Sequence, residues 1–207
     1  MTGIYWDCDG TLMNTESAYA YPWQEVLKRR NLNLPIQHFD DYVGIDDKLV
    51  HQKYSEKVEL PSFSETMDEI ALIIIENFTS QTLYSDAHKC LDYFYNENWQ
   101  QACVSASPQK ALEDKLNKAE ISKYFDFVLG GDFVRPRNKP FPDIYNLAIN
   151  KLGTSKNIIV EDSPPGIQSG KSSGNYVVAI DRGIFRKNEL SNADVIVEEL
   201  TPDLFLQ

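Results

Sequence analysis

The stretch Ile4-Tyr5-Trp6-Asp7-Cys8-Asp9-Gly10-Thr11, close to the start of the chain, decides the fold. Its apolar beginning predicts a short buried strand. Asp7 and Asp9 follow, and strand alternation turns both carboxylates to one face and Cys8 to the other. Two buried like charges are costly unless a cation or a proton offsets them. The alternative is an ordinary strand-to-turn exit with solvated acids, because Asp-Gly also marks turns.

A divalent cation would offset these charges, since carboxylates bind such ions and open parallel sheets bind ligands at the carboxyl ends of their strands. One carboxylate can then attack phosphorus while the other handles a proton. The later motifs decide between this interpretation and the ordinary turn.

The composition describes a folded, acidic chain. Of its 207 residues, 42% are hydrophobic and 12% are aromatic, which is enough for a substantial core. The net charge is −11, so we expect neither nucleic acid nor an anionic membrane surface as a partner. An anionic small molecule would have to be held by local positive charge.

The cysteines and the apolar runs indicate the compartment. Cys8, Cys90 and Cys103 lie far apart and form no CxxC pair, which favours a reducing environment. No signal peptide is visible, and the longest strongly apolar run, 70–75, is too short to cross a membrane. We therefore expect a cytoplasmic protein. For its assembly we expect a monomer or a weak homo-oligomer.

Apolar runs alternate with amphipathic helices in the second half of the chain. The runs predict strands at 101–104, 127–129, 158–160, 176–180 and, at the edge, 194–197. Ser107 and Pro108 predict the N-cap and first residue of one helix, and Gly153 predicts the end of another. This alternation is typical of a parallel sheet covered on both faces, and the strand at 4–6 matches it in composition.

The segment between the first strand and this alternating part is helical. From Thr15 to about Thr82 there is no convincing strand. One helix face carries Met67, Ile70, Ala71, Ile74 and Phe78, and Leu72, Ile73 and Ile75 add a second apolar surface. The sequence therefore predicts a core formed by residues 1–14 and 84–207, with a helical insertion at 15–83.

Polar side chains follow the predicted strands, where open α/β sheets bind ligands. Ser105-Ala106-Ser107 offers a hydroxyl and main-chain amides before a helix, which suits phosphate. A plain N-cap would explain Ser107 but not Ser105. Lys139 lies between Asn138 and Pro140, and the nearby prolines can aim its ammonium inward, although a loop lysine is usually solvated.

Glu161 and Asp162 follow the most apolar strand of the chain. An acidic pair at such a strand end suits a metal or catalytic site, and an acidic helix N-terminus is the other explanation.

The order of these motifs resembles the haloacid dehalogenase-like hydrolase superfamily. The motifs are Asp-x-Asp-Gly-Thr at 7–11, the serine of a strand end, Lys-Pro-x-Pro-Asp-Ile-Tyr at 139–145 and Glu-Asp-Ser-x-x-Gly-Ile at 161–167. The resemblance covers nearly the whole chain. More narrowly, the chain resembles the branch that contains β-phosphoglucomutase and small sugar-phosphate phosphatases. It implies an α/β fold with a Rossmann-like parallel sheet core, helices on both faces and an inserted α-helical cap.

The resemblance also implies catalytic roles. Asp7 is expected to be the nucleophile that forms an aspartyl-phosphate, and Asp9 the acid that protonates the leaving oxygen and then activates water. Ser105 and the amide of Ala106 are expected to bind the transferring phosphoryl group, and Lys139 to neutralise its charge. Positioning and charge neutralisation do most of the work in phosphoryl transfer, which suits this division.

A Mg²⁺ site is implied as well. Its expected ligands are Asp7, the main-chain carbonyl of Asp9 and Asp162, with Glu161 beside them. The second aspartate speaks against true haloacid dehalogenation, which needs neither a metal nor an acid–base partner at that position.

Two departures from the family pattern concern the substrate. β-Phosphoglucomutase-like enzymes carry a His where this chain has Tyr19, and an Arg in the loop that here reads Gly44-Ile45-Asp46-Asp47. Both favour a phosphatase of a small phosphorylated metabolite, such as a sugar or polyol phosphate. A hexose-phosphate mutase is the alternative among enzymes, and a non-catalytic binding or regulatory module is the alternative from another class.

Overall fold

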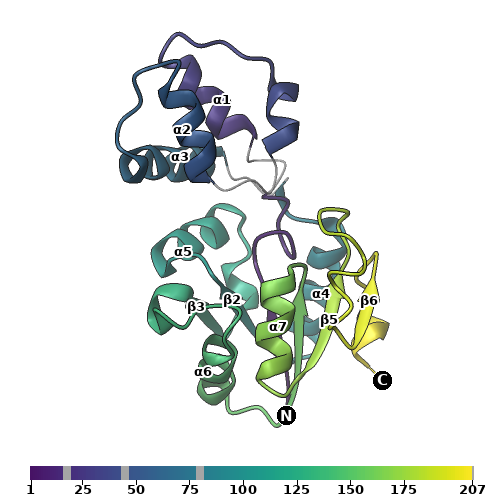
Figure 1. Cartoon of the computed structure of the whole chain (residues 1–207). Helices are drawn as coiled ribbons and strands as arrows, with labels where there is room; N and C mark the ends of the chain where they lie inside the picture. The colour runs from purple at the N-terminus through teal and green to yellow at the C-terminus, as the bar shows by residue number, and fades with distance from the viewer. Residues whose placement is uncertain (16–19, 43–46, 78–81, 207) are drawn as a thin grey trace. The chain divides into compact units, whose positions relative to one another are not determined.

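The computed structural model describes residues 1–15, 20–42, 47–77 and 82–206 of the chain. The chain forms two compact units, Met1–Asn14 with Thr79–Gln207 and Thr15–Phe78, and most of their helices and strands are labelled in Figure 1. Tyr19, Phe78 and the stretch Gly44-Ile45-Asp46, which the sequence singled out, lie outside the described residues.

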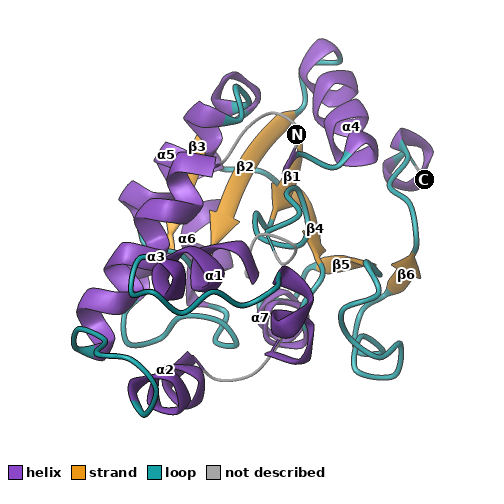
Figure 2. Cartoon of the chain, turned by 90° about the horizontal axis from the view of Figure 1, so that it is seen from above, coloured by secondary structure: helices purple, strands orange, loops and turns teal. Residues whose placement is uncertain are grey.

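The larger unit is built on a six-stranded sheet in which all paired strands are parallel. Its strands are β1 (Thr2–Trp6), β2 (Gln100–Ser105), β3 (Phe127–Gly130), β4 (Lys156–Glu161), β5 (Tyr176–Ile180) and β6 (Val195–Val197). Figure 2 shows them side by side in the order β3-β2-β1-β4-β5-β6. The predicted strands are confirmed, and this is the Rossmann-like order.

Helices cover both faces of this sheet, which is why the strands carry nearly continuous apolar runs. The helices of the unit are α4 (Ser85–Asn96), α5 (Gln109–Lys118), α6 (Asp143–Leu152) and α7 (Pro164–Ser172), with the 3-10 turns η3 (Ser122–Tyr124), η4 (Gly131–Val134) and η5 (Pro202–Phe205). On one face, α6 and α7 pack against Tyr5 and Val177. On the other, Phe205 packs against Trp6 and Phe94, with ring centroids 5.6 and 5.2 Å apart.

The helix ends test two predictions. Gly153 terminates α6 in the left-handed conformation, with φ of 68°, as predicted. The predicted N-cap at Ser107 is wrong, because α5 begins at Gln109 and Pro108 occupies the cap position. The main-chain N–H of Gln109 donates instead to Asp132 Oδ1, at 2.8 Å. A side chain distant in sequence therefore caps α5 and leaves the Ser107 hydroxyl available for other contacts.

The secondary-structure elements of the smaller unit are all helices in its described residues. Its elements are α1 (Ala20–Lys28), η1 (Ile36–Tyr42), α2 (Asp47–Ser55) and α3 (Phe63–Asn77). Trp23, Phe39 and Tyr54 form its core with Ile70 and Ile73 of α3. The predicted helix is confirmed, but of its second apolar surface Ile73 is buried whereas Leu72 is 60% exposed. In the described part of both units, no helix has the length and apolar character that a membrane span requires.

Candidate active site

The strand order places the ends of β1 and β4 side by side in the middle of the sheet. From there the chain continues toward β2 on one side and toward β5 on the other. At such a switch point the connections diverge and leave a crevice, which is where open α/β sheets bind ligands. Asp7 directly follows β1, and Glu161 and Asp162 stand at the end of β4.

These acids form a buried cluster. Asp7, Glu161 and Asp162 each offer a carboxylate oxygen, and these oxygens all lie within 4.8 Å of one another. Burial, followed by the charge of Glu161, raises the pKa of Asp7 to about 7, against the opposing effect of Lys139. Burial and the charges of Asp7 and Glu161 hold the pKa of Asp162 well above its usual range. The cluster thus has the donor chemistry and the excess negative charge of a divalent cation site.

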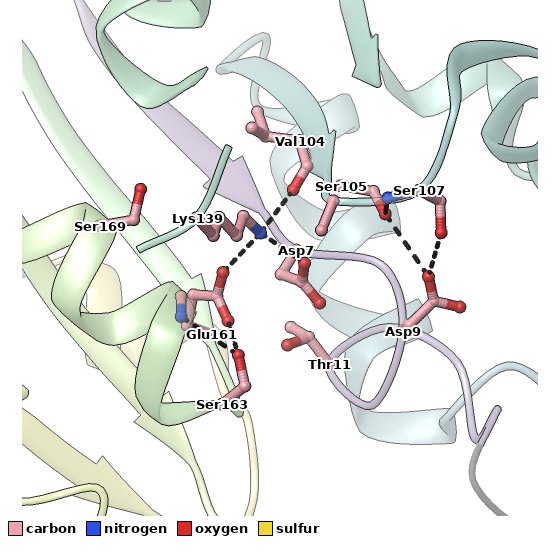
Figure 3. A network of polar contacts seen from close by, with 12 residues as sticks. Asp7, Asp9, Thr11, Val104, Ser105, Ser107, Lys139, Glu161, Ser163 and Ser169 are labelled. Carbon is pink, nitrogen blue, oxygen red and sulfur yellow. Dashed lines mark hydrogen bonds and ion pairs between the residues drawn. The ribbon is translucent and has the colours of Figure 1, made fainter. Parts of the chain in front are cut away.

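Lys139 brings a positive charge to this cluster. Its Nζ lies 2.6 Å from Asp7 Oδ1 and 2.6 Å from Glu161 Oε1, and it donates to the carbonyl of Val104 at 3.0 Å, as Figure 3 shows. Burial disfavours the ammonium, but the carboxylates of Asp7 and Glu161 outweigh this and keep the pKa of Lys139 well above its usual range. Lys139 is therefore a charged member of the site and not a solvated loop residue.

Glu161 has protein partners on both of its carboxylate oxygens. Oε1 accepts a hydrogen bond from the buried hydroxyl of Tyr145 at 2.6 Å in addition to that from Lys139, and Oε2 accepts one from Ser163 at 3.1 Å. Ser163 also accepts a hydrogen bond from the N–H of Gly166 and so caps α7. A Cβ at Gly166 would lie 2.0 Å from the carboxyl atoms of Glu161, which explains the glycine. Glu161 therefore anchors Lys139 and the start of α7.

The turn after the two aspartates is fixed to the end of β4. Thr11 donates to Asp162 Oδ1 at 3.1 Å, and Gly10, with φ of +83°, lies so close that a Cβ would be 2.1 Å from Asp162 Oδ2. Arg182 donates to the carbonyl of Thr11 at 3.1 Å and pairs with the buried Asp86 at 2.8 Å. These contacts hold the β1 loop and Asp162 in one arrangement.

Asp9 belongs to a neighbouring group of residues. Its Oδ2 accepts hydrogen bonds from Ser107 at 3.0 Å and Ser105 at 3.4 Å, which Figure 3 shows. Lys115 Nζ lies 2.5 and 2.7 Å from the two oxygens of Asp9. Ala106, between the serines, is exposed, and its carbonyl accepts a hydrogen bond from Asn138 at 3.0 Å. The structure thus places the acid–base candidate beside the predicted phosphate cradle.

Lys115 and Tyr145 received no role from the sequence. Lys115 follows Leu112 by three positions and precedes Leu116, so it stands at the border of the apolar face of α5. This position was the only indication in the sequence that its side chain could be buried. Tyr145 lies within the Lys-Pro-x-Pro-Asp-Ile-Tyr motif and follows the buried Ile144. Sequence alone does not show which side chains such residues meet.

Comparison with known proteins agrees with this geometry. The family model of haloacid dehalogenase-like hydrolases matches residues 4–180. The chain is 25% identical over 187 residues to the phosphorylated carbohydrates phosphatase of Thermotoga maritima, covering 84% of this chain and 82% of that protein. It is 26% identical over 213 residues to the phosphoglycolate phosphatase of Vibrio parahaemolyticus, covering 96% and 92%.

A solved structure shows the same fold. The crystal structure of a CbbY variant from Rhodobacter sphaeroides in complex with xylulose-(1,5)-bisphosphate superposes with a TM-score of 0.74 at 17% identity, covering 95% of this chain and 93% of that one. The chain belongs to the haloacid dehalogenase-like hydrolase family. It is thus an enzyme of the hydrolase class.

Proposed function

We propose that this enzyme is a Mg²⁺-dependent phosphatase that hydrolyses a small phosphorylated sugar or polyol through an aspartyl-phosphate at Asp7. One observation carries the proposal: Asp7 lies within a buried acidic cluster and 2.6 Å from the buried ammonium of Lys139. A nucleophilic carboxylate beside a fixed cation is suited to attack on a phosphoryl group, whose negative charge must be neutralised during transfer. The relatives named as phosphatases of phosphorylated carbohydrates and of phosphoglycolate support the same chemistry.

In the first half of the reaction, a carboxylate oxygen of Asp7 attacks phosphorus. The bond from phosphorus to the ester oxygen breaks, its electron pair stays on that oxygen, and Asp9 supplies the proton that releases an alcohol. Lys139 favours the ionised nucleophile through its contact with Asp7 Oδ1. Ser105 and the amide of Ala106 are assigned to the phosphoryl oxygens, next to Asp9.

In the second half, water attacks the phosphorus of the aspartyl-phosphate. Asp9 takes the proton of this water, the bond from phosphorus to Asp7 breaks, and inorganic phosphate leaves. Asp9 then carries the proton again, so both aspartates return to their starting states.

The donor set fits Mg²⁺, which prefers carboxylate and carbonyl oxygens. We assign Asp7, Asp162 and the main-chain carbonyl of Asp9 to it, with Glu161 beside them holding Lys139. When bound, the ion would supply positive charge to the transferring phosphoryl group.

We propose that residues 15–83, which include the helical unit, act as the cap of the family and select the substrate. Tyr19 and the stretch 44–47 lack the His and Arg of the mutase pattern, which favours phosphate release over phosphate return to the sugar.

The test is a panel of sugar phosphates, polyol phosphates and phosphoglycolate, assayed for phosphate release with Mg²⁺ and with a chelator. We expect release with Mg²⁺, loss with the chelator, and no release by Asp7→Asn. Hydrolysis retained in Asp7→Asn would overturn the aspartyl-phosphate route. Interconversion of phosphosugar isomers without phosphate release would identify a mutase instead.

A further inference from the structure

Lys115 is a buried cation directed at Asp9. Its ammonium contacts both carboxylate oxygens of Asp9, at 2.5 and 2.7 Å. Only 10% of the Lys115 side chain is exposed, compared with 82% for Lys110, which precedes it on α5 and pairs with Asp114. Ordering a long lysine side chain and removing it from water are both costly, so this placement needs a compensating partner. Asp9 is that partner.

Ser107 closes the arrangement. Lys115 donates to Ser107 Oγ at 3.3 Å, and the Ser107 hydroxyl donates to Asp9 Oδ2 at 3.0 Å. Because Ser107 accepts from the ammonium, its own hydrogen is directed to Asp9. The Asp9 side chain remains 31% exposed, so its carboxyl group is held from the protein side and accessible from the other.

We propose that Lys115 is a positioning residue for the proton transfers of Asp9, and that it works together with Ser107. This inference rests on the proposed phosphatase function and assigns to Lys115 a part that is distinct from that of Lys139. A carboxyl group that is already oriented needs no rearrangement when it gives a proton to the ester oxygen or takes one from water. Lys115 touches neither phosphorus nor the ester oxygen in this scheme; it acts through Asp9.

The dependence of the hydrolysis rate on the leaving group distinguishes this role from a merely structural one. When the bond from phosphorus to a phenyl ester oxygen breaks, the electron pair left on that oxygen requires a proton from Asp9. A 2,4-dinitrophenolate is stable without that proton. Misplacing Asp9 should therefore slow hydrolysis of phenyl phosphate much more than hydrolysis of 2,4-dinitrophenyl phosphate. General acid catalysis contributes about 10²–10⁴-fold to rates, which sets the scale.

The experiment measures kcat/KM for both esters with Mg²⁺, because this constant reports the half-reaction in which the alcohol leaves. The variants are Lys115→Met, which keeps the length of the apolar stem, Lys115→Arg, Ser107→Ala and the control Lys110→Met. We expect Lys115→Met to lose about 10- to 100-fold more kcat/KM with phenyl phosphate than with 2,4-dinitrophenyl phosphate. Ser107→Ala should show a smaller loss of the same kind, Lys115→Arg a partial recovery, and Lys110→Met no change.

The outcomes are distinguishable. Equal losses with the two esters, or no loss, in both Lys115→Met and Ser107→Ala would overturn the positioning role while the wild-type enzyme remains an active phosphatase. The proposed function is tested separately: a wild-type enzyme that releases phosphate from neither ester and from no sugar phosphate, polyol phosphate or phosphoglycolate of the panel would overturn it, and this inference with it. Ser107→Ala keeps the test decisive if circular dichroism shows that Lys115→Met does not fold.

Discussion

The ammonium of Lys139 lies 2.6 Å from a carboxylate oxygen of Asp7, although 132 positions separate the two residues in the chain. The same ammonium lies 2.6 Å from Glu161, which ends a different strand. One lysine therefore offsets two buried carboxylates, and Asp162 adds a third to the cluster. The cluster therefore carries more negative than positive charge.

Replacing Lys139 by Met should destabilise the protein as well as inactivate it. Removal of one partner of a buried ion pair typically costs roughly 3–5 kcal/mol, because the remaining charge stays buried without compensation. Urea denaturation measures this loss. The control is Lys110→Met, which alters an exposed side chain of α5 and should leave the midpoint unchanged. An unchanged midpoint in Lys139→Met would contradict the buried pair.

Without metal, stability should fall as the pH rises from about 4 to about 7. The pKa of Asp7 is raised from 3.8 to about 7 in the folded protein, so in this interval the folded state binds more protons than the unfolded chain. The free energy of unfolding then decreases with pH, and the raised pKa of Asp162 acts in the same direction. Melting temperatures in a chelator measure the slope. It should be smaller in Asp7→Asn and unchanged in Asp203→Asn, which alters an exposed residue of η5. Equal slopes in all three proteins would refute the prediction.

Asp162→Asn should have opposite effects with and without Mg²⁺. In a chelator it removes one of three mutually repelling buried acids, so we expect a higher melting temperature than in the wild type. Mg²⁺ should raise the melting temperature of the wild type but not of the variant, because ligand binding stabilises only the state that binds. Differential scanning fluorimetry over a Mg²⁺ titration provides both readings. A wild-type response in Asp162→Asn would remove this residue from the metal site.

Gly166→Ala should destabilise α7, although alanine usually stabilises a helix by about 0.5–1 kcal/mol relative to glycine. The added Cβ would lie 2.0 Å from the carboxyl atoms of Glu161, so the start of α7 or Glu161 must move. Thermal melts and phosphatase assays should both show a loss, whereas Ser172→Ala on the exposed end of α7 should show neither. A stabilised, fully active Gly166→Ala enzyme would show that Glu161 tolerates displacement.

Much of the fold can be predicted from the sequence because buried strands appear as short, local runs of apolar residues. Continuous apolar runs such as 158–160 and 176–180 require burial on both faces, and their alternation with helices determines a parallel sheet. Asp7 and the acids at 161–162 were also predictable as neighbours, since they stand at the ends of strands that meet at one edge. The start of α5 at Gln109 was not predictable, because its N–H donates to Asp132, a residue from a distant part of the chain.

The sequence by itself determined the class of fold, and it predicted the insertion after the first strand and the acids of the site, because these depend on spacing along the chain. Only the tertiary structure decided that Lys115 meets Asp9 and that Tyr145 meets Glu161. The physical reason is that a lysine at the border of a helix face is equally compatible with water or with a buried carboxylate. The segment packed against that helix determines which of the two the lysine meets. A single sequence does not specify how close that segment lies.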